Sequence, residues 1–151
     1  MTIVNTLKDY IVGLQHIGHI VEDREASIDA FRKLYGLEDD AIRRVPDEPD
    51  GTEPTLFAFI SVGDTEFEII QPQSHESRAE LMLSLCGGGG INHVAWRVND
   101  IDAAVRHLGK QRVRPGHVTP DGVVDTGRSR IVYLDPADTD GLLIELVELP
   151  A

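Results

Sequence analysis

An internal repeat constrains this 151-residue chain more than any other feature of its sequence. The segment LQHI around His16 recurs as INHV around His93, 77 residues later. The segment FEII around Glu68 recurs as IELV around Glu145, again 77 residues later. Each half of the chain therefore carries one histidine and one glutamate, and in both halves they lie 52 residues apart. Two pairs that share one offset indicate a duplicated module.

Both halves predict the same order of elements, a strand, a helix and three further strands. The first half has a strand at 13–21, a helix at 25–34, and strands at 39–45, 56–62 and 66–71, with a hairpin turn at Gly63-Asp64. A short apolar helix at 79–85 precedes the glycine run 87–90. The second half has a strand at 91–98, a helix at 100–108 capped by Asp100, a strand at 112–118, a loop at 120–127, and strands at 130–134 and 142–149.

This order predicts one α+β domain over residues 1–151. A first βαβββ module covers 13–72, a helix and glycine-rich linker covers 73–90, and a second βαβββ module covers 91–149. We expect a curved, mostly antiparallel sheet around a cavity, with the helices outside. Because side chains alternate between the two faces of a strand, the repeated histidines and glutamates can all face that cavity.

The repeated residues form a set that suits a metal ion. Imidazole and carboxylate groups are ligands for borderline and hard divalent cations. Two neutral histidines and two glutamates bring a charge of about −2, and the set contains no thiolate of the kind that structural zinc sites often use. We therefore expect one divalent ion, cobalt, manganese, nickel, zinc, magnesium or iron, at a site made of His16, Glu68, His93 and Glu145.

Composition excludes several other classes of protein. The chain has 14 basic and 26 acidic residues, a net charge of −12, and so lacks the basic surface that a nucleic-acid-binding protein needs. Cys86 is the single cysteine, which rules out an intrachain disulfide, and we interpret it as a small buried hydrophobic residue. No apolar run approaches the length of a membrane-spanning helix. These features predict a cytoplasmic protein that binds neither membranes nor nucleic acids.

Three segments resemble the vicinal oxygen chelate superfamily, which includes glyoxalase I, methylmalonyl-CoA epimerases, extradiol dioxygenases and drug-resistance proteins. They are LQHIG from Leu14, HVAWRVNDID from His93, and LDP from Leu134 followed by IEL at 144–146. The resemblance covers 14–149 and is greatest to the methylmalonyl-CoA epimerases. It implies paired βαβββ modules, metal ligands at the two repeated pairs, a homodimer, and a small carbonyl compound or an acyl-CoA as substrate.

The chain departs from the epimerase pattern in two places. The epimerases that it resembles often carry glutamine where this chain has Glu68. They also carry a second catalytic glutamate at the position that aligns with Phe57, and a phenyl ring cannot transfer a proton. Glu66 is an alternative second base, although a solvated residue beside the Gly63-Asp64 turn is the simpler interpretation.

We expect a divalent-metal-dependent epimerase or isomerase, or a lyase like glyoxalase I, that transfers a proton next to a carbonyl. Glu145 or Glu68 would act as the base, and Arg97 and Arg128 would bind the substrate. Two other functional classes remain as alternatives to this enzyme. A non-haem iron dioxygenase uses two histidines and one carboxylate. A metal-free binding protein of the resistance type would lose the ligand set that this chain keeps.

Overall fold

The computed structural model describes residues 6–82 and 90–151, and it divides into two compact units. One unit is His16–Asn92, and the other combines the N-terminal residues through Gln15 with His93–Ala151. Apart from short helical turns, each half of the chain has the order strand, helix and three strands. The expected α+β class with two βαβββ modules is therefore confirmed.

The strands of the first module are ordered β2-β3-β4-β1. Their bounds are β1 (Ile11–Ile20), β2 (Ile42–Val45), β3 (Thr55–Val62) and β4 (Thr65–Pro72). The strands β2, β3 and β4 are antiparallel, and β1 lies parallel to β4. Gly63 adopts a positive φ of 61° between β3 and β4, so the predicted hairpin turn is confirmed.

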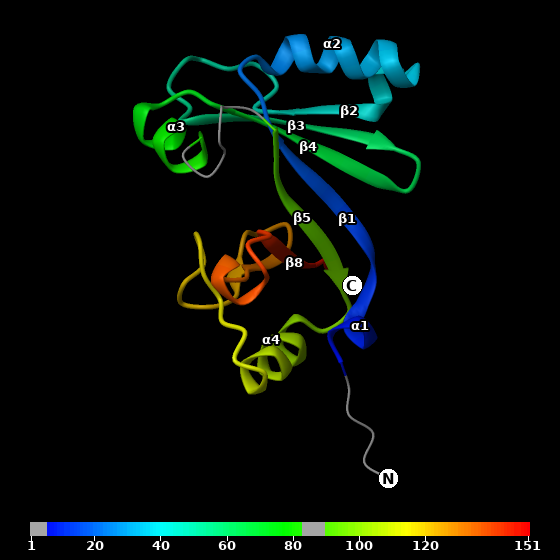
Figure 1. Ribbon diagram of the computed structural model, residues 1–151. Helices are drawn as coiled ribbons and strands as arrows, with labels where there is room; N and C mark the ends of the chain where they lie inside the picture. Colours follow the sequence, from blue (N-terminus) through cyan, green and yellow to red (C-terminus); the bar gives the residue numbers. More distant parts are fainter. Residues whose placement is uncertain (1–5, 83–89) are drawn as a thin grey trace. The chain divides into compact units, whose positions relative to one another are not determined.

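Helix α2 (Arg24–Tyr35) lies across one face of the strands β2, β3 and β4 (Figure 1). Asp23 begins the helix by accepting a hydrogen bond from the backbone of Ala26, and Gly36 ends it in the left-handed conformation. The buried core between this helix and the strands consists of Val21, Ile28, Ala58, Ile60 and Ile69. The opposite face of these strands carries the alternate side chains, among them that of Glu68.

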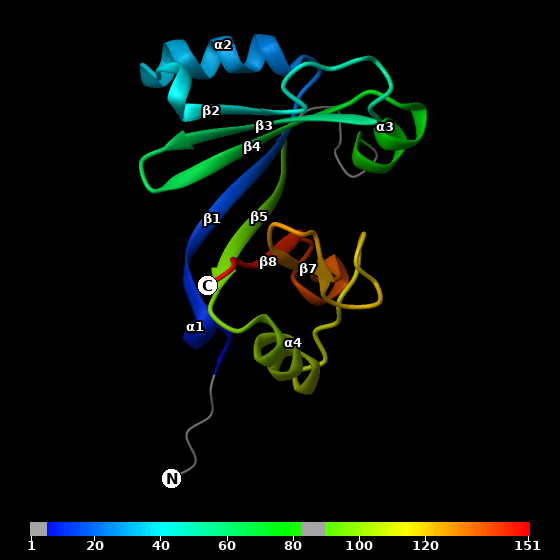
Figure 2. The ribbon, with the colours of Figure 1, turned by 180° about the vertical axis from the view of Figure 1, so that it is seen from behind.

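The strands of the second module are ordered β5-β8-β7-β6. Their bounds are β5 (Gly90–Val98), β6 (Val124–Asp125), β7 (Arg130–Tyr133) and β8 (Ile144–Glu148). Helix α4 (Ile101–Lys110) follows β5 (Figure 2). It begins after Asp100, whose side chain accepts a hydrogen bond from the backbone of Ala103, as predicted. The core of this module includes Val98, Ile101, Ala104, Leu108, Val132, Leu134 and Leu146.

The predicted strand at 112–118 is wrong. Arg112 and His117 have φ values of 65° and 55°, which an extended strand cannot contain, and Pro115 makes only an isolated bridge to Leu134. The short strand β6 lies instead within the predicted loop 120–127. The polar, proline-containing sequence of 112–127 carries no clear strand pattern, so neither the irregular backbone at 112–118 nor the strand β6 was predicted.

Smaller differences concern the ends of elements. Residues Asp39–Ala41, predicted as the start of a strand, form the 3-10 turn η1 before β2. Helix α3 (His75–Met82) begins before the predicted helix at 79–85, and a short helix α1 (Leu7–Tyr10) precedes β1. Cys86 and the glycines at 87–89 lie outside the described residues. Among the described helices, none is long and apolar enough to cross a membrane.

Candidate metal centre

The strand register repeats between the two modules. In the parallel pair β1–β4, Gly18 is the cross-strand partner of Glu68. In the parallel pair β5–β8, Ala95 is the cross-strand partner of Glu145. Both residues of the second pair lie 77 positions after those of the first, so the repeat found in the sequence is also a repeat of the hydrogen-bonded register.

The first module brings His16 and Glu68 together. His16 lies two residues before Gly18 on β1 and therefore shares the face that bears Glu68. Its Nε2 atom is 3.1 Å from Oε2 of Glu68, and the two side chains are 8% and 13% exposed. The face opposite α2 therefore carries an imidazole and a carboxylate that are largely removed from water.

The second module repeats this arrangement with His93 and Glu145. Nε2 of His93 is 3.1 Å from Oε2 of Glu145, and the side chains are 1% and 5% exposed. Ala95, two residues after His93 and the register partner of Glu145, is fully buried and has only a small side chain. A carboxylate buried to this extent requires a compensating charge or hydrogen bonds, and an adjacent divalent cation would supply that charge.

Each glutamate also has an aromatic residue as its cross-strand partner on the antiparallel neighbouring strand. Phe59 of β3 is the antiparallel partner of Glu68, and Tyr133 of β7 is the partner of Glu145. The Tyr133 ring meets the His93 ring edge to face, with 5.4 Å between the centroids. Tyr133 therefore packs against a candidate ligand and holds its imidazole in place.

Sequence reasoning missed Tyr133 because the aromatic pair does not share the offset of the repeat. Tyr133 lies 74 residues after Phe59 instead of 77. The second hairpin is longer by three residues, which matches the length of the 3-10 turn η2 (Pro136–Asp138) between β7 and β8. Aligning the two hairpins backwards from their glutamates, with one insertion in the turn, would have revealed the pair.

A second ring contacts Tyr133 from outside the strand. His117 packs edge to face on Tyr133 with 5.2 Å between the ring centroids. The turn that carries His117 is bound to β7 because the Gly116 amide donates to the Tyr133 carbonyl and the Thr119 hydroxyl accepts from the Tyr133 amide. His117 is exposed and takes part in this aromatic contact.

Phe57 lies on β3, on the face that bears Glu68. It is the cross-strand partner of Ile70 and lies two residues from Phe59 on β3. The neighbouring Glu53 accepts hydrogen bonds from two backbone amides of its own loop, which fixes its carboxylate there. Glu66 is the register partner of His16 and shares the face of Glu68. A role for Glu66 as the second base stays a prediction.

Arg97 lies on β5 two residues after Ala95, on the face that also bears His93. Its Nη1 atom is 3.4 Å from Oε1 of Gln15, and its Nη2 atom lies against Gly13. Arg97 also lines a hollow of about 450 Å³ together with Val12, Val98, Asn99 and Glu148–Ala151. The guanidinium is thus directed along β1, and substrate binding by Arg97 stays a prediction.

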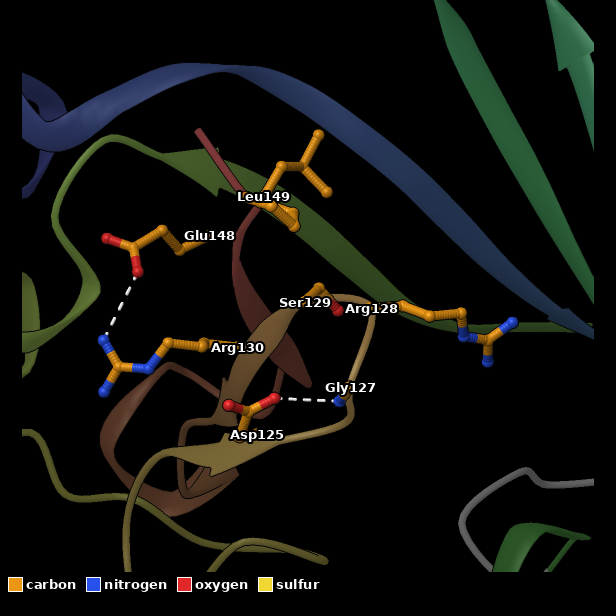
Figure 3. Close-up of a pocket in the computed structure, with 8 residues that line it drawn as sticks. Asp125, Gly127, Arg128, Ser129, Arg130, Glu148 and Leu149 are labelled. Atoms are coloured by element: carbon orange, nitrogen blue, oxygen red, sulfur yellow. Dashed lines mark hydrogen bonds and ion pairs between the residues drawn. The ribbon is translucent and has the colours of Figure 1, made fainter.

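Arg128 and Arg130 have different surroundings although they are close in the chain. Arg130 binds Asp102 at 2.7 Å and Glu148 at 3.3 Å, and its hydrogen bonds hold the pKa of Asp102 below its ordinary value. Arg128 lies in the turn between β6 and β7, where Asp125 accepts a hydrogen bond from the Gly127 amide. Figure 3 shows the Arg128 side chain extending away from the Arg130–Glu148 pair. Arg130 is therefore a structural residue, and Arg128 is exposed.

Comparison with known proteins assigns the family. The family model described as the glyoxalase/bleomycin resistance protein/dioxygenase superfamily matches residues 15–133. The chain belongs to this superfamily, as the sequence resemblance predicted.

Within the superfamily, the similar proteins include several epimerases. The ethylmalonyl-CoA/methylmalonyl-CoA epimerase of Cereibacter sphaeroides is 30% identical over 90% of this chain and 97% of its own length. The structure of methylmalonyl-CoA epimerase from Mycobacterium tuberculosis is 29% identical, covers 99% of this chain and 94% of its own, and has a TM-score of 0.74.

A third relative carries a ligand. A variant of Streptomyces coelicolor methylmalonyl-CoA epimerase, solved with 2-nitronate-propionyl-CoA, is 25% identical and has a TM-score of 0.73 over 93% of this chain and 99% of its own. These relatives confirm the predicted enzyme class, an isomerase of the epimerase kind, which was the first of the three classes considered.

Proposed function

We propose that the chain is a metal-dependent epimerase that inverts the carbon next to the thioester carbonyl of a branched malonyl-CoA. One divalent ion would be held by His16, Glu68, His93 and Glu145. The observation that carries the proposal is the pair of histidine–glutamate contacts, both 3.1 Å long and both at the same place in the strand register. The names and ligands of the epimerases described above support the choice of substrate.

The donor set fits a divalent ion. Two neutral imidazoles and two carboxylates are ligands of the borderline and hard cations, and the two negative charges balance a charge of about +2. Four protein ligands leave positions open only on an ion of higher coordination number, where a substrate with two oxygen atoms can bind. When bound, such an ion acts as a Lewis acid on the carbonyl oxygen of the substrate.

The carboxylates of the chain would transfer the proton. The carbon next to the thioester carbonyl loses its proton to a glutamate oxygen, while the electron pair of the C–H bond moves toward the carbonyl oxygen. Return of a proton to the opposite side of the planar carbon gives the other epimer. Glu145 or Glu68 would take part on one side. Phe57 supplies no proton on the other side, so Glu66, on the face of Glu68, is the candidate there.

Deuterium exchange tests this function. Metal-loaded protein is incubated in D₂O with one epimer of methylmalonyl-CoA, and mass spectrometry and chiral analysis follow the label and the configuration. We expect one deuterium to enter the substrate as the epimer ratio approaches equality. Absence of both exchange and inversion, with ethylmalonyl-CoA as well, would contradict the proposal.

Three further features belong to the proposal. Anomalous scattering from crystals of the purified protein would identify the ion. A homodimer is proposed from the resemblance, and light scattering of the purified chain would measure it. A cytoplasmic location is proposed from the single cysteine.

A further inference from the structure

Four residues form a row across the first module, on the face opposite α2. Arg43 of β2 is the cross-strand partner of Phe59, Phe59 is the partner of Glu68, and Glu68 is the partner of Gly18. Direct cross-strand partners place their side chains on the same face of a sheet. Arg43 therefore shares a face with Glu68 and His16, the candidate ligands of this module.

The guanidinium of Arg43 is held in a defined place. Its Cζ atom lies 4.4 Å from the centroid of the Phe59 ring, which is the geometry of a cation–π contact. The side chain thus leans along the row toward Glu68, and Arg43 remains exposed. Arginine stacked on a ring keeps its N–H donors in one plane, and these can bind two oxygens of a phosphate or carboxylate.

The neighbouring Arg44 has a different environment. It faces the other side of β2, where its Nη2 atom is 2.8 Å from a carboxylate oxygen of Glu25 on α2. In the described part of this acidic chain, ion pairs also engage most of the other arginines, namely Arg24, Arg32, Arg78, Arg114 and Arg130. Among the residues that the structure describes, no ion pair engages Arg43. Its positive charge is therefore available to an anion.

The spacing of strands indicates which part of a substrate would reach Arg43. Neighbouring strands lie about 4.8 Å apart, so the backbones of Arg43 and Glu68 are separated by roughly 10 Å. The Arg43 side chain extends over Phe59 into this interval, so a group bound to it lies beside the reacting carbon and not at the proton-transferring oxygens of Glu68. We propose that Arg43, supported by Phe59, is an anion-binding subsite that takes an oxyanion of the substrate, a phosphate of the CoA part or a carboxylate of the acyl part. This proposal rests on the proposed function for its substrate.

Steady-state kinetics of Arg43→Ala, with Arg44→Ala as the matched control, tests the subsite. Arg43 contributes to binding and not to proton transfer, so its removal should raise KM about tenfold or more while kcat stays within about twofold. Arg43→Lys should recover part of the loss because the charge remains without the planar fork. Arg44→Ala should leave KM unchanged. An unchanged KM in Arg43→Ala, or equal changes in both alanine variants, would overturn the proposal.

A truncated substrate identifies the oxyanion. The methylmalonyl thioester of pantetheine keeps the acyl carboxylate and lacks the phosphates. If Arg43 binds a phosphate, Arg43→Ala raises KM for the CoA thioester alone. If it binds the carboxylate, KM rises for both thioesters.

Calorimetric titration with CoA and with methylmalonate separates this proposal from the proposed function, because it needs no turnover. Even if the protein proves inactive as an epimerase, one of these two probes should bind Arg43→Ala about tenfold more weakly than the wild type. If Arg43→Ala binds CoA as tightly as the wild type does, and also binds methylmalonate as tightly, the subsite is overturned whatever the reaction.

Discussion

Nε2 of His93 lies 3.1 Å from the Glu145 carboxylate, with only 1% and 5% of the two side chains exposed. The equivalent pair, His16 and Glu68, has the same separation but exposures of 8% and 13%. The second module thus holds its carboxylate in the drier environment, where electrostatic interactions are less screened. We infer that Glu145 makes the larger catalytic contribution.

Substitution of each glutamate by glutamine tests this difference. Glutamine keeps an oxygen ligand but cannot act as a general base. We expect Glu145→Gln to lower kcat by about 10²- to 10⁴-fold and Glu68→Gln to lower it by about tenfold or less. Each variant is assayed at measured metal content. Equal losses in the two variants would contradict the inference.

Tyr133 should matter to the metal through its ring and not through its hydroxyl. The ring packs edge to face on His93, and groups that orient a ligand commonly change metal affinity about 10- to 100-fold when they are removed. Tyr133→Leu should weaken metal binding by about tenfold, whereas Tyr133→Phe should preserve it. Competition with a chromogenic chelator measures both. Equally weakened binding in Tyr133→Phe and Tyr133→Leu would assign the effect to the hydroxyl.

Gly116 should be intolerant of a side chain. A Cβ atom added there would lie 2.8 Å from Cα of Asp135, so the backbone must move. Gly116→Ala should lower the free energy of unfolding by about 1–3 kcal/mol, as overpacking does. Gly109 in α4 has open space around it, and Gly109→Ala should instead be neutral or stabilising by up to about 1 kcal/mol. Urea denaturation compares the two, and equal stabilities would refute the predicted clash.

The Asp102–Arg130 pair should make stability depend on pH in the acid range. Hydrogen bonds from Arg130 lower the pKa of Asp102 from 3.8. Because the folded pKa is depressed, the stabilisation is present above 3.8 and is lost as the pH falls through the lower folded value. The urea midpoint of the wild type should therefore fall more steeply below this pH than that of Asp102→Asn. Parallel curves would show that the pair contributes nothing to the acid dependence.

The sequence predicted the elements that a regular repeat defines. The alternation of side chains placed His16 and Glu68, and likewise His93 and Glu145, on common faces, and the register of β1–β4 and β5–β8 agrees. Local signals were also sufficient where one residue type decides the backbone, as at the Asp100 helix cap. These features depend on short-range geometry that is the same in any protein.

Features that depend on antiparallel partners escaped prediction. Tyr133 and Arg43 acquire their neighbours through the pairings of β7 with β8 and of β2 with β3, and no local pattern specifies those registers. The segment 112–118 was predicted wrongly for a different reason. The turn with a positive φ at His117 is held by hydrogen bonds to β7, which is distant in the sequence. That the two modules share one ion is likewise a proposal, and it is based on the repeat in the sequence.

Metal stoichiometry tests the central claim, that the two histidine–glutamate pairs together hold one ion. Purified protein is saturated with cobalt or manganese, freed of excess metal, and analysed by inductively coupled plasma mass spectrometry beside His16→Ala and His93→Ala. If the two pairs share one site, the wild type holds one ion per chain and either variant loses most of its affinity. Two ions per chain, or undiminished binding after removal of one histidine, would contradict a single shared site.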